Sequence, residues 1–243
     1  MNFLSKWICY CAFLCVHYAW ADTLKVSIPK MKTHATNKDK GVLVDFTKAL
    51  AIHLKQNVDI QLVPFSRSIY YVSTGKVDFH LPLIKPLDNS TGGHESIIYS
   101  DETIFYVNFV LYSHKDKPIN VANLSKYKIE TESAHLSFFP DVKLGSDCII
   151  CSLKKVQYKV TDGYLFADSS TDPILLENKS FLTDMKRQLY QRFEVKVVFP
   201  NNAKGNKLNK QISDIIVNMR LSGELDKLLA VVDFPYSDWQ LNE

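Results

Sequence analysis

Strands and helices alternate in the first third of the chain, and this order constrains the fold more than any other feature. Short β-prone runs occur at 24–28, 58–63 and 77–81. Between the first two runs, apolar side chains recur at helical spacing after Gly41, at Leu43, Phe46, Leu50 and Leu54. A strand–helix–strand order of this kind predicts parallel pairing through right-handed crossovers. The sequence therefore predicts an α/β unit with a parallel sheet.

A second α/β unit is predicted after Pro118. Its expected elements are strands at 127–129, 163–167 and 195–199, helices around 148–156 and over 181–192, and C-terminal helices at 208–221 and 223–231. Residues 99–114 lie between the two units, are strongly β-prone, and are long for one strand. Two lobes joined by extended crossings form a hinge, and the cleft between them is the natural place for a ligand.

The N-terminus has the three parts of a secretory signal peptide. Lys6 supplies the positive charge, residues 7–16 form the apolar stretch, and Ala19-Trp20-Ala21 fits a cleavage site for signal peptidase. A membrane anchor would need about 20 apolar residues, and a lipid anchor at Cys15 would need small residues in place of the bulky ones before it. We predict that residues 1–21 are a cleaved signal peptide and that the protein is exported.

The cysteines indicate a disulfide. Three of the five cysteines lie within the predicted signal peptide, which leaves Cys148 and Cys151. In an oxidising compartment a pair with this spacing is expected to form a structural disulfide. Two alternatives stay open. A redox-active pair usually has tryptophan, glycine or proline between or beside its cysteines, unlike Ile149-Ile150. A zinc site would need two more ligands.

Charge and motifs exclude several classes of function. The net charge is +3, and the lysines are scattered rather than gathered in a stripe, which argues against a nucleic-acid surface. The sequence contains no GxSxG, HExxH, P-loop or glycine-rich dinucleotide motif. We therefore predict no catalytic residues, no metal, no cofactor and no nucleic-acid partner, and we expect a monomer.

Four motifs, in order along the chain, carry a family resemblance. They are Gly41–Phe46, Pro64–Arg67 followed by Gly75–Asp78, Tyr99–Asp101 with Tyr106, and Leu221–Leu228. With them, residues 22–234 resemble a type II periplasmic solute-binding protein, of a divergent subgroup related to the polar amino-acid-binding proteins (family 3).

The resemblance implies a two-lobed α/β fold in which two hinge strands join the lobes and each lobe has a mixed or parallel sheet flanked by helices. Lobe I would comprise 22–106 plus 200–243, and lobe II 107–199. It also implies a periplasmic protein that captures a small polar ligand, amino-acid-like or related, for an ABC-type transporter and its membrane permease. The alternative is a sensory or interaction module of the same fold that signals to a membrane protein. A thiol–disulfide enzyme built on the cysteine pair is a third possibility.

The chain departs from the family after the third predicted strand. Amino-acid binders of the family place there an arginine that clamps the ligand carboxylate through two parallel hydrogen bonds. Residues 81–90 contain no arginine, and Lys85 offers only a point charge. This departure argues against a standard α-amino acid as the ligand.

Six residues are candidate ligand contacts under the resemblance. Arg67 would hold an anionic group at a helix N-terminus, Phe65 would stack on the ligand, and Lys85 would follow the third strand. In lobe II the candidates are Ser133, His135 and Asp168, of which Asp168 would pair with an amino group. Each also has a structural interpretation: Arg67 as a surface or ion-paired residue, Phe65 as a core residue, and Asp168 as a solvated loop residue.

Overall fold

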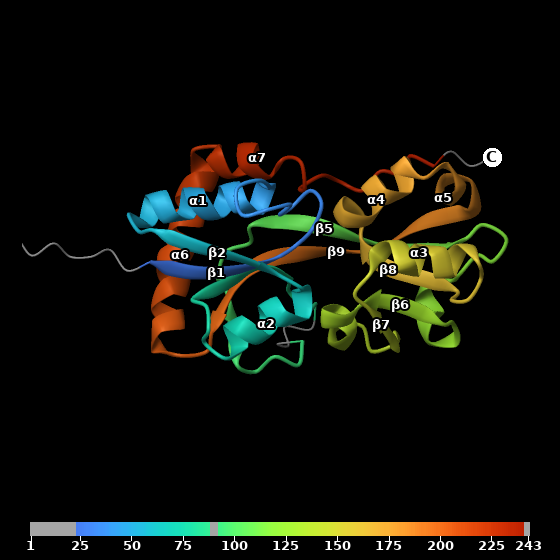
Figure 1. The fold of residues 1–243 in the computed structure, drawn as a ribbon, viewed down its shortest axis with the longest axis horizontal. Helices are drawn as coiled ribbons and strands as arrows, with labels where there is room; N and C mark the ends of the chain where they lie inside the picture. Colours follow the sequence, from blue (N-terminus) through green and yellow to red (C-terminus); the bar gives the residue numbers. More distant parts are fainter. Residues whose placement is uncertain (1–22, 88–91, 241–243) are drawn as a thin grey trace, which may run out of the picture.

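The computed structural model describes residues 23–87 and 92–240 (Figure 1). The predicted signal peptide, residues 1–21, lies outside the described residues. Within the described ranges, no helix has both the length and the apolar character needed to cross a membrane.

The described chain alternates strands and helices, as predicted. The strands are β1 (Leu24–Pro29), β2 (Val58–Val63), β3 (Phe79–Ile84), β4 (Ile97–Tyr99), β5 (Phe105–His114), β6 (Ile129–Glu132), β7 (Leu144–Ser146), β8 (Gly163–Ala167) and β9 (Met185–Pro200). The α-helices are α1 (Val42–Leu54), α2 (Phe65–Ser73), α3 (Ile149–Gln157), α4 (Asp168–Glu177), α5 (Lys179–Asp184), α6 (Ala203–Leu221) and α7 (Glu224–Leu229). Two 3₁₀ helices, η1 (Val121–Lys126) and η2 (Ser133–Phe138), flank β6.

One mixed sheet runs through the molecule in the order β2-β1-β3-β9-β5-β8-β6-β7, with β4 paired to β9. The outer strands pair in parallel, β1 with β2 and β3, and β6 with β7 and β8. The two long central strands, β5 and β9, are antiparallel and cross from one half of the molecule to the other (Figure 1). We call β1–β4, α1, α2, α6 and α7 the first half, and β6–β8, η1, η2 and α3–α5 the second half. The predicted α/β class, with two crossing strands, is confirmed.

The helix predicted at 181–192 is wrong. Helix α5 ends at Asp184, and β9 begins at Met185 and pairs with β5 along its length, from His114–Met185 to Phe105–Val195. Residues 185–192 have good intrinsic helix propensity. Without this segment, however, one edge of β5 would lose its hydrogen-bonding partner, and buried backbone groups require partners. Tertiary pairing therefore overrides local propensity here.

The long β-prone segment predicted at 99–114 divides into two strands. Strand β4 ends at Tyr99, and β5 begins at Phe105. Between them, the Ser100 amide donates to the Val197 carbonyl (2.7 Å) and the Ile104 amide donates to the Val195 carbonyl (2.9 Å). The chain therefore stays beside β9 while it passes from the first half into the crossing strand.

The C-terminal segment 233–240 extends from α7 towards the second half (Figure 1). The Asn108 side-chain amide donates to the Phe234 carbonyl (3.1 Å), and the Trp239 indole N–H donates to Asp172 of α4 (3.3 Å). The guanidinium of Arg187, in β9, lies over the Trp239 ring, 4.5 Å from its centroid. The segment thus ties the crossing strands to α4, on the side of the molecule where the halves are joined.

Candidate functional site

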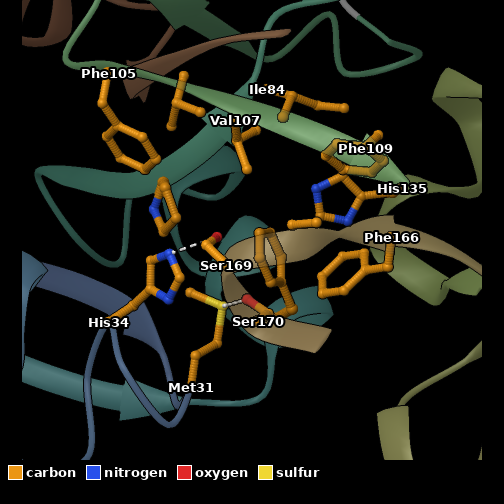
Figure 2. Close-up of a pocket in the computed structure, with 14 residues that line it drawn as sticks. Met31, His34, Ile84, Phe105, Val107, Phe109, His135, Phe166, Ser169 and Ser170 are labelled. Carbon is orange, nitrogen blue, oxygen red and sulfur yellow. Dashed lines mark hydrogen bonds between the residues drawn. The ribbon is translucent and has the colours of Figure 1, made fainter. Parts of the chain in front are cut away.

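A small cavity of about 30 Å³ lies where the two halves meet (Figure 2). Its lining residues are Met31, His34, Phe65, Pro82, Ile84, Phe105, Val107, Phe109, His135, Phe166, Ala167, Ser169, Ser170 and Val195. Several of these residues follow the carboxyl ends of parallel strands: Met31 after β1, Phe65 after β2, His135 after β6 and Ser169 after β8. Ligands of α/β proteins bind at this edge of a sheet, so the topology brings a binding edge from each half to one place.

His34 reaches the cavity from the loop between β1 and α1, and Gly41 shapes that loop. Gly41 has φ +144°, and a Cβ added there would lie 2.4 Å from the His34 carbonyl oxygen. That carbonyl accepts a hydrogen bond from the Leu43 amide (2.9 Å), which fixes the loop onto the start of α1. The glycine of the first family-like motif is therefore required by close backbone packing that sets the position of His34.

The His34 imidazole is buried and uncharged at neutral pH. Its side chain belongs to a residue only 3% exposed, and burial lowers its pKa to about 4. Nε2 lies 3.4 Å from the Ser169 hydroxyl across the cavity, and Nδ1 has no hydrogen-bond partner among the described residues (Figure 2). One nitrogen is weakly bonded and the other is unsatisfied, so the imidazole has capacity for a further hydrogen bond.

Two more histidines surround Phe65. The Phe65 ring centroid lies 4.6 Å from that of His135 and 5.7 Å from that of His80. His135 Nδ1 is 3.0 Å from Glu132, and His80 Nδ1 is 2.6 Å from the Ser68 hydroxyl. Burial lowers the pKa of His80 to about 3. The Phe65–His135 contact joins α2 of the first half to η2 of the second.

Two of the contacts between the halves are long or exposed to solvent. The Ser170 hydroxyl lies 3.8 Å from the Met31 sulfur. Lys32 and Glu177 form an ion pair whose side chains are 54% and 61% exposed. Exposed ion pairs and long contacts of this kind contribute about 1 kcal/mol or less each. These two contacts therefore add little to the closed arrangement, in which α2 and η2 also meet through Phe65 and His135 and the Ser137 hydroxyl donates to the Gly92 carbonyl (2.6 Å).

The predicted site residues divide into two groups. Phe65 and His135 line the cavity, and Ser133 lies beside it in a groove formed by α2 and η2. Arg67 is exposed on α2 and makes no ion pair with any residue of the described ranges. Lys85 follows β3, and its backbone amide donates to the Glu194 carbonyl of β9 (2.8 Å). Neither Arg67 nor Lys85 is among the residues that line the cavity.

Asp168 is buried away from the cavity. Its carboxylate accepts hydrogen bonds from the Asn108 side chain (2.9 Å) and the Ser169 amide (2.6 Å). Asn108 lies between Val107 and Phe109 in β5, and successive side chains of a strand point to opposite faces. Because Val107 and Phe109 line the cavity, Asp168 contacts the opposite face of that strand. Burial raises the pKa of Asp168 to about 6, although the Asn108 hydrogen bond opposes this shift.

We expect Asp168→Asn to increase the loss of stability on acidification. The raised pKa means that the folded state binds a proton more tightly than the unfolded state, so this group adds stability as the pH falls through 6. Between pH 7.5 and 5 the contribution is about 1 kcal/mol. Chemical denaturation at both pH values gives the change in unfolding free energy for each protein. The contribution of Asp168 is the difference between this change in the native protein and in the variant. A pH dependence unchanged by the substitution would contradict the assignment.

The sequence did not single out His34, Ser169, Ser170, Phe109 or Phe166 as site residues. His34 and the two serines follow β1 and β8, so the strand-end rule could have found them. The serines were hidden because α4 begins directly at the end of β8, and no helix was expected there. The two phenylalanines lie within strands, where only the structure distinguishes a cavity wall from the core.

The cysteine pair forms the predicted disulfide. Cys148 and Cys151 are bonded, with their Cα atoms 5.2 Å apart. Cys148 is the N-cap residue of α3, and the Cys151 amide donates to its sulfur (3.3 Å). Across residues 23–87 and 92–240, no three histidine, cysteine or acidic side chains are grouped so as to hold a metal ion. The bonded pair is consistent with a structural bond at the start of a helix.

Comparison with known proteins gives a match of fold. No family model matches the chain, and no curated protein matches its sequence. Among solved structures, the substrate-binding protein of an amino acid ABC transporter is 19% identical, with a TM-score of 0.67 over 87% of this chain and 99% of that one. A histidine kinase sensor domain with similarity to periplasmic binding proteins is 15% identical, with a TM-score of 0.71 over 88% and 96%. The GluR0 ligand-binding core from Nostoc punctiforme, in complex with L-glutamate, is 14% identical, with a TM-score of 0.67 over 87% and 100%. The chain therefore has the two-lobed fold of periplasmic-binding-protein-like domains.

Proposed function

We propose that the protein is an exported, periplasmic solute-binding protein that closes its two halves around a small molecule and presents the closed form to an ABC-type transporter. The observation that supports this most is the position of the cavity, at the meeting of strand ends from both halves. The predicted signal peptide and the cysteine disulfide agree with an oxidising compartment. We propose that the protein is a monomer that catalyses no reaction and binds neither a cofactor nor nucleic acid.

Binding in this proposal requires opening of the cleft. A cavity of about 30 Å³ holds no more than a water molecule or two, whereas small-molecule sites measure roughly 300–1,000 Å³. We propose that residues 22–106 plus 200–243 move as one lobe and 107–199 as the other, with β5 and β9 as the hinge. A ligand with contacts to both lobes then shifts the population towards a closed form that encloses it.

A sensory role is the second candidate. The solved sensor domain of a histidine kinase has the same fold as this chain. Closure around a ligand would be the same event in both roles, and only the membrane protein that recognises the closed form would differ. Pull-down with purified permease and sensor-kinase ectodomains, with and without ligand, separates the two roles.

A thermal-shift screen of the mature protein against amino acids, polyamines, organic acids and small aromatic compounds tests the proposal. A ligand at 100 times its Kd stabilises the folded state by about 2.7 kcal/mol, and small-angle scattering should show the halves closing on it. Phe65→Ala and His135→Ala should abolish the response, whereas Tyr70→Ala, on the exposed side of α2, should not. No response from any compound, or a response that survives both cavity variants, would overturn the proposed site. The proposal does not rely on Arg67, Lys85 or Asp168, which lie outside the cavity.

A thiol–disulfide enzyme is testable on the same preparation. We expect that, with the protein present, dithiothreitol reduces insulin no faster than it does without the protein. Rapid insulin reduction that depends on Cys148 and Cys151 would instead support the enzyme.

A further inference from the structure

The chemistry of the cavity wall restricts the kind of solute that the proposed site can accept. None of the residues lining the cavity is a lysine, arginine, aspartate or glutamate. The two histidines in the wall come from opposite halves, and the buried His34 is uncharged at neutral pH. The wall thus presents no formally charged partner of the kind that a charged ligand group would need.

Three charged residues that are close in sequence to wall residues already have partners. Glu132 accepts hydrogen bonds from His135 and from the Ala134 amide (2.9 Å). Asp168 is bonded to Asn108 on the opposite face of β5. Lys196 follows the wall residue Val195 in β9, and its ammonium donates to the Asp101 carbonyl (3.0 Å). A zwitterion enclosed here would bury a carboxylate and an ammonium without partners, which is strongly unfavourable.

The wall is instead well suited to an aromatic ring. Phe65 comes from α2 of the first half and Phe166 from β8 of the second half. Phe105 and Phe109 come from the crossing strand β5 (Figure 2). The Phe109 and Phe166 rings already meet edge to face, with centroids 5.7 Å apart. A planar ligand ring would extend this arrangement, since aromatic side chains favour edge-to-face and offset contacts.

One polar side chain of the cavity wall, His34, is incompletely hydrogen-bonded. His34 Nδ1 is buried without a hydrogen-bond partner in the described part of the chain, and its Nε2 is only 3.4 Å from the Ser169 hydroxyl. Buried polar atoms are normally satisfied, and among the described wall residues His34 alone has a buried side-chain nitrogen or oxygen without a partner. A ligand hydroxyl or ring N–H could bond to this imidazole.

We infer that the solute is an uncharged molecule with an aromatic ring and one hydrogen-bonding group, of the phenol or indole type, and not a zwitterionic amino acid. This inference rests on the proposed function and specifies its ligand class. The ring would contact phenylalanines on both sides of the cleft, and its polar group would bond to His34 of the first half. These contacts form together only when the halves close around the ligand, with a cavity larger than the 30 Å³ of the present structure, so such a ligand would favour that closed form.

Matched probe pairs test the inference on the unmodified protein. 4-Methylphenol and L-tyrosine share one ring, and 3-methylindole and L-tryptophan share another, so each pair differs by the zwitterionic group. Calorimetric titration should give a Kd for the uncharged member at least tenfold below that of its amino acid. The comparison needs no variant, so it does not depend on a substituted protein folding.

A second measurement locates the hydrogen bond. In the unmodified protein, 4-methylphenol should bind at least fivefold more tightly than toluene, which lacks the hydroxyl. His34→Ala should remove this preference. His53→Ala is the matched control, because His53 is exposed and paired with Glu224 at the far end of α1. A preference that persists in His34→Ala would overturn the assignment of His34.

The outcomes separate the ligand class from the function. If L-tyrosine, L-tryptophan or another amino acid binds more tightly than the uncharged probes, and Phe109→Ala weakens it, the ligand class is wrong while the proposed function stands. If no probe and no compound of the wider screen shifts the melting temperature or closes the halves, both are wrong.

Discussion

Acidification from pH 7.5 to 5 is expected to remove roughly 4 kcal/mol of unfolding free energy through two buried histidines. His34 and His80 are 3% and 0% exposed, and burial lowers their pKa values to about 4 and about 3. In the unfolded chain each would titrate near its ordinary pKa of 6.5. At pH 5 the unfolded state therefore binds about two more protons than the folded state.

The sign of the pH dependence follows from this difference in the number of bound protons. A histidine whose folded pKa is lowered contributes stability above pH 6.5, and the contribution is lost as the pH falls below this value. Each histidine accounts for about 2 kcal/mol at pH 5. Asp168 acts in the opposite direction and returns about 1 kcal/mol over the same interval, because its pKa is raised to about 6.

Urea denaturation at the two pH values checks this prediction. His80→Asn retains a polar atom near the position of Nδ1, which contacts Ser68 and the Ser27 carbonyl, and it does not titrate. We expect this variant to show about 2 kcal/mol less pH dependence than the native protein. A pH profile that is the same in His80→Asn and the native protein would contradict the prediction.

Local pattern was enough to predict most of the fold. Strands β2 and β8 occur at the predicted residues, and α1 begins directly after Gly41, because in these segments the periodicity and the breaking residues agree. The crossing strand β9 was not predicted over 185–192. This segment forms a strand because it pairs with β5, which lies some 80 residues earlier in the sequence. No local sequence pattern contains that information.

The site was predicted less completely than the fold. Phe65 and His135 could be placed near the cleft because they directly follow strands, and position relative to a strand end is a local property. The direction of Asp168 could not be predicted. Whether it faces the cleft depends on its bond to Asn108, hence on the register of β5 beside β8. Strand order and register also decide which phenylalanines become cavity walls.

Arg187→Met is expected to lower the unfolding free energy by about 3–5 kcal/mol, because it breaks a buried ion pair from one side. The Arg187 side chain is 1% exposed. Its Nε and one terminal nitrogen donate to the two oxygens of Asp172, at 2.9 and 2.5 Å, and the other terminal nitrogen donates to the Ser237 carbonyl (3.1 Å). Without the guanidinium, the largely buried Asp172 carboxylate keeps only the neutral donors Tyr112 and Trp239, and the C-terminal segment loses a contact.

Arg220→Met is the matched control for the same chemical change at a partly exposed pair. Arg220 and Glu102 are 2.7 Å apart, with side chains 41% and 34% exposed, so the loss there should be about 1 kcal/mol or less. Denaturant midpoints of the two variants give the comparison. Equal effects would show that Asp172 needs no charged partner.

If the pair acts as described, Arg187→Met combined with Asp172→Asn should be more stable than Arg187→Met alone, because the second change removes the uncompensated charge. The buried charge pair would then be one of the contacts that hold the C-terminal segment against β9 and α4.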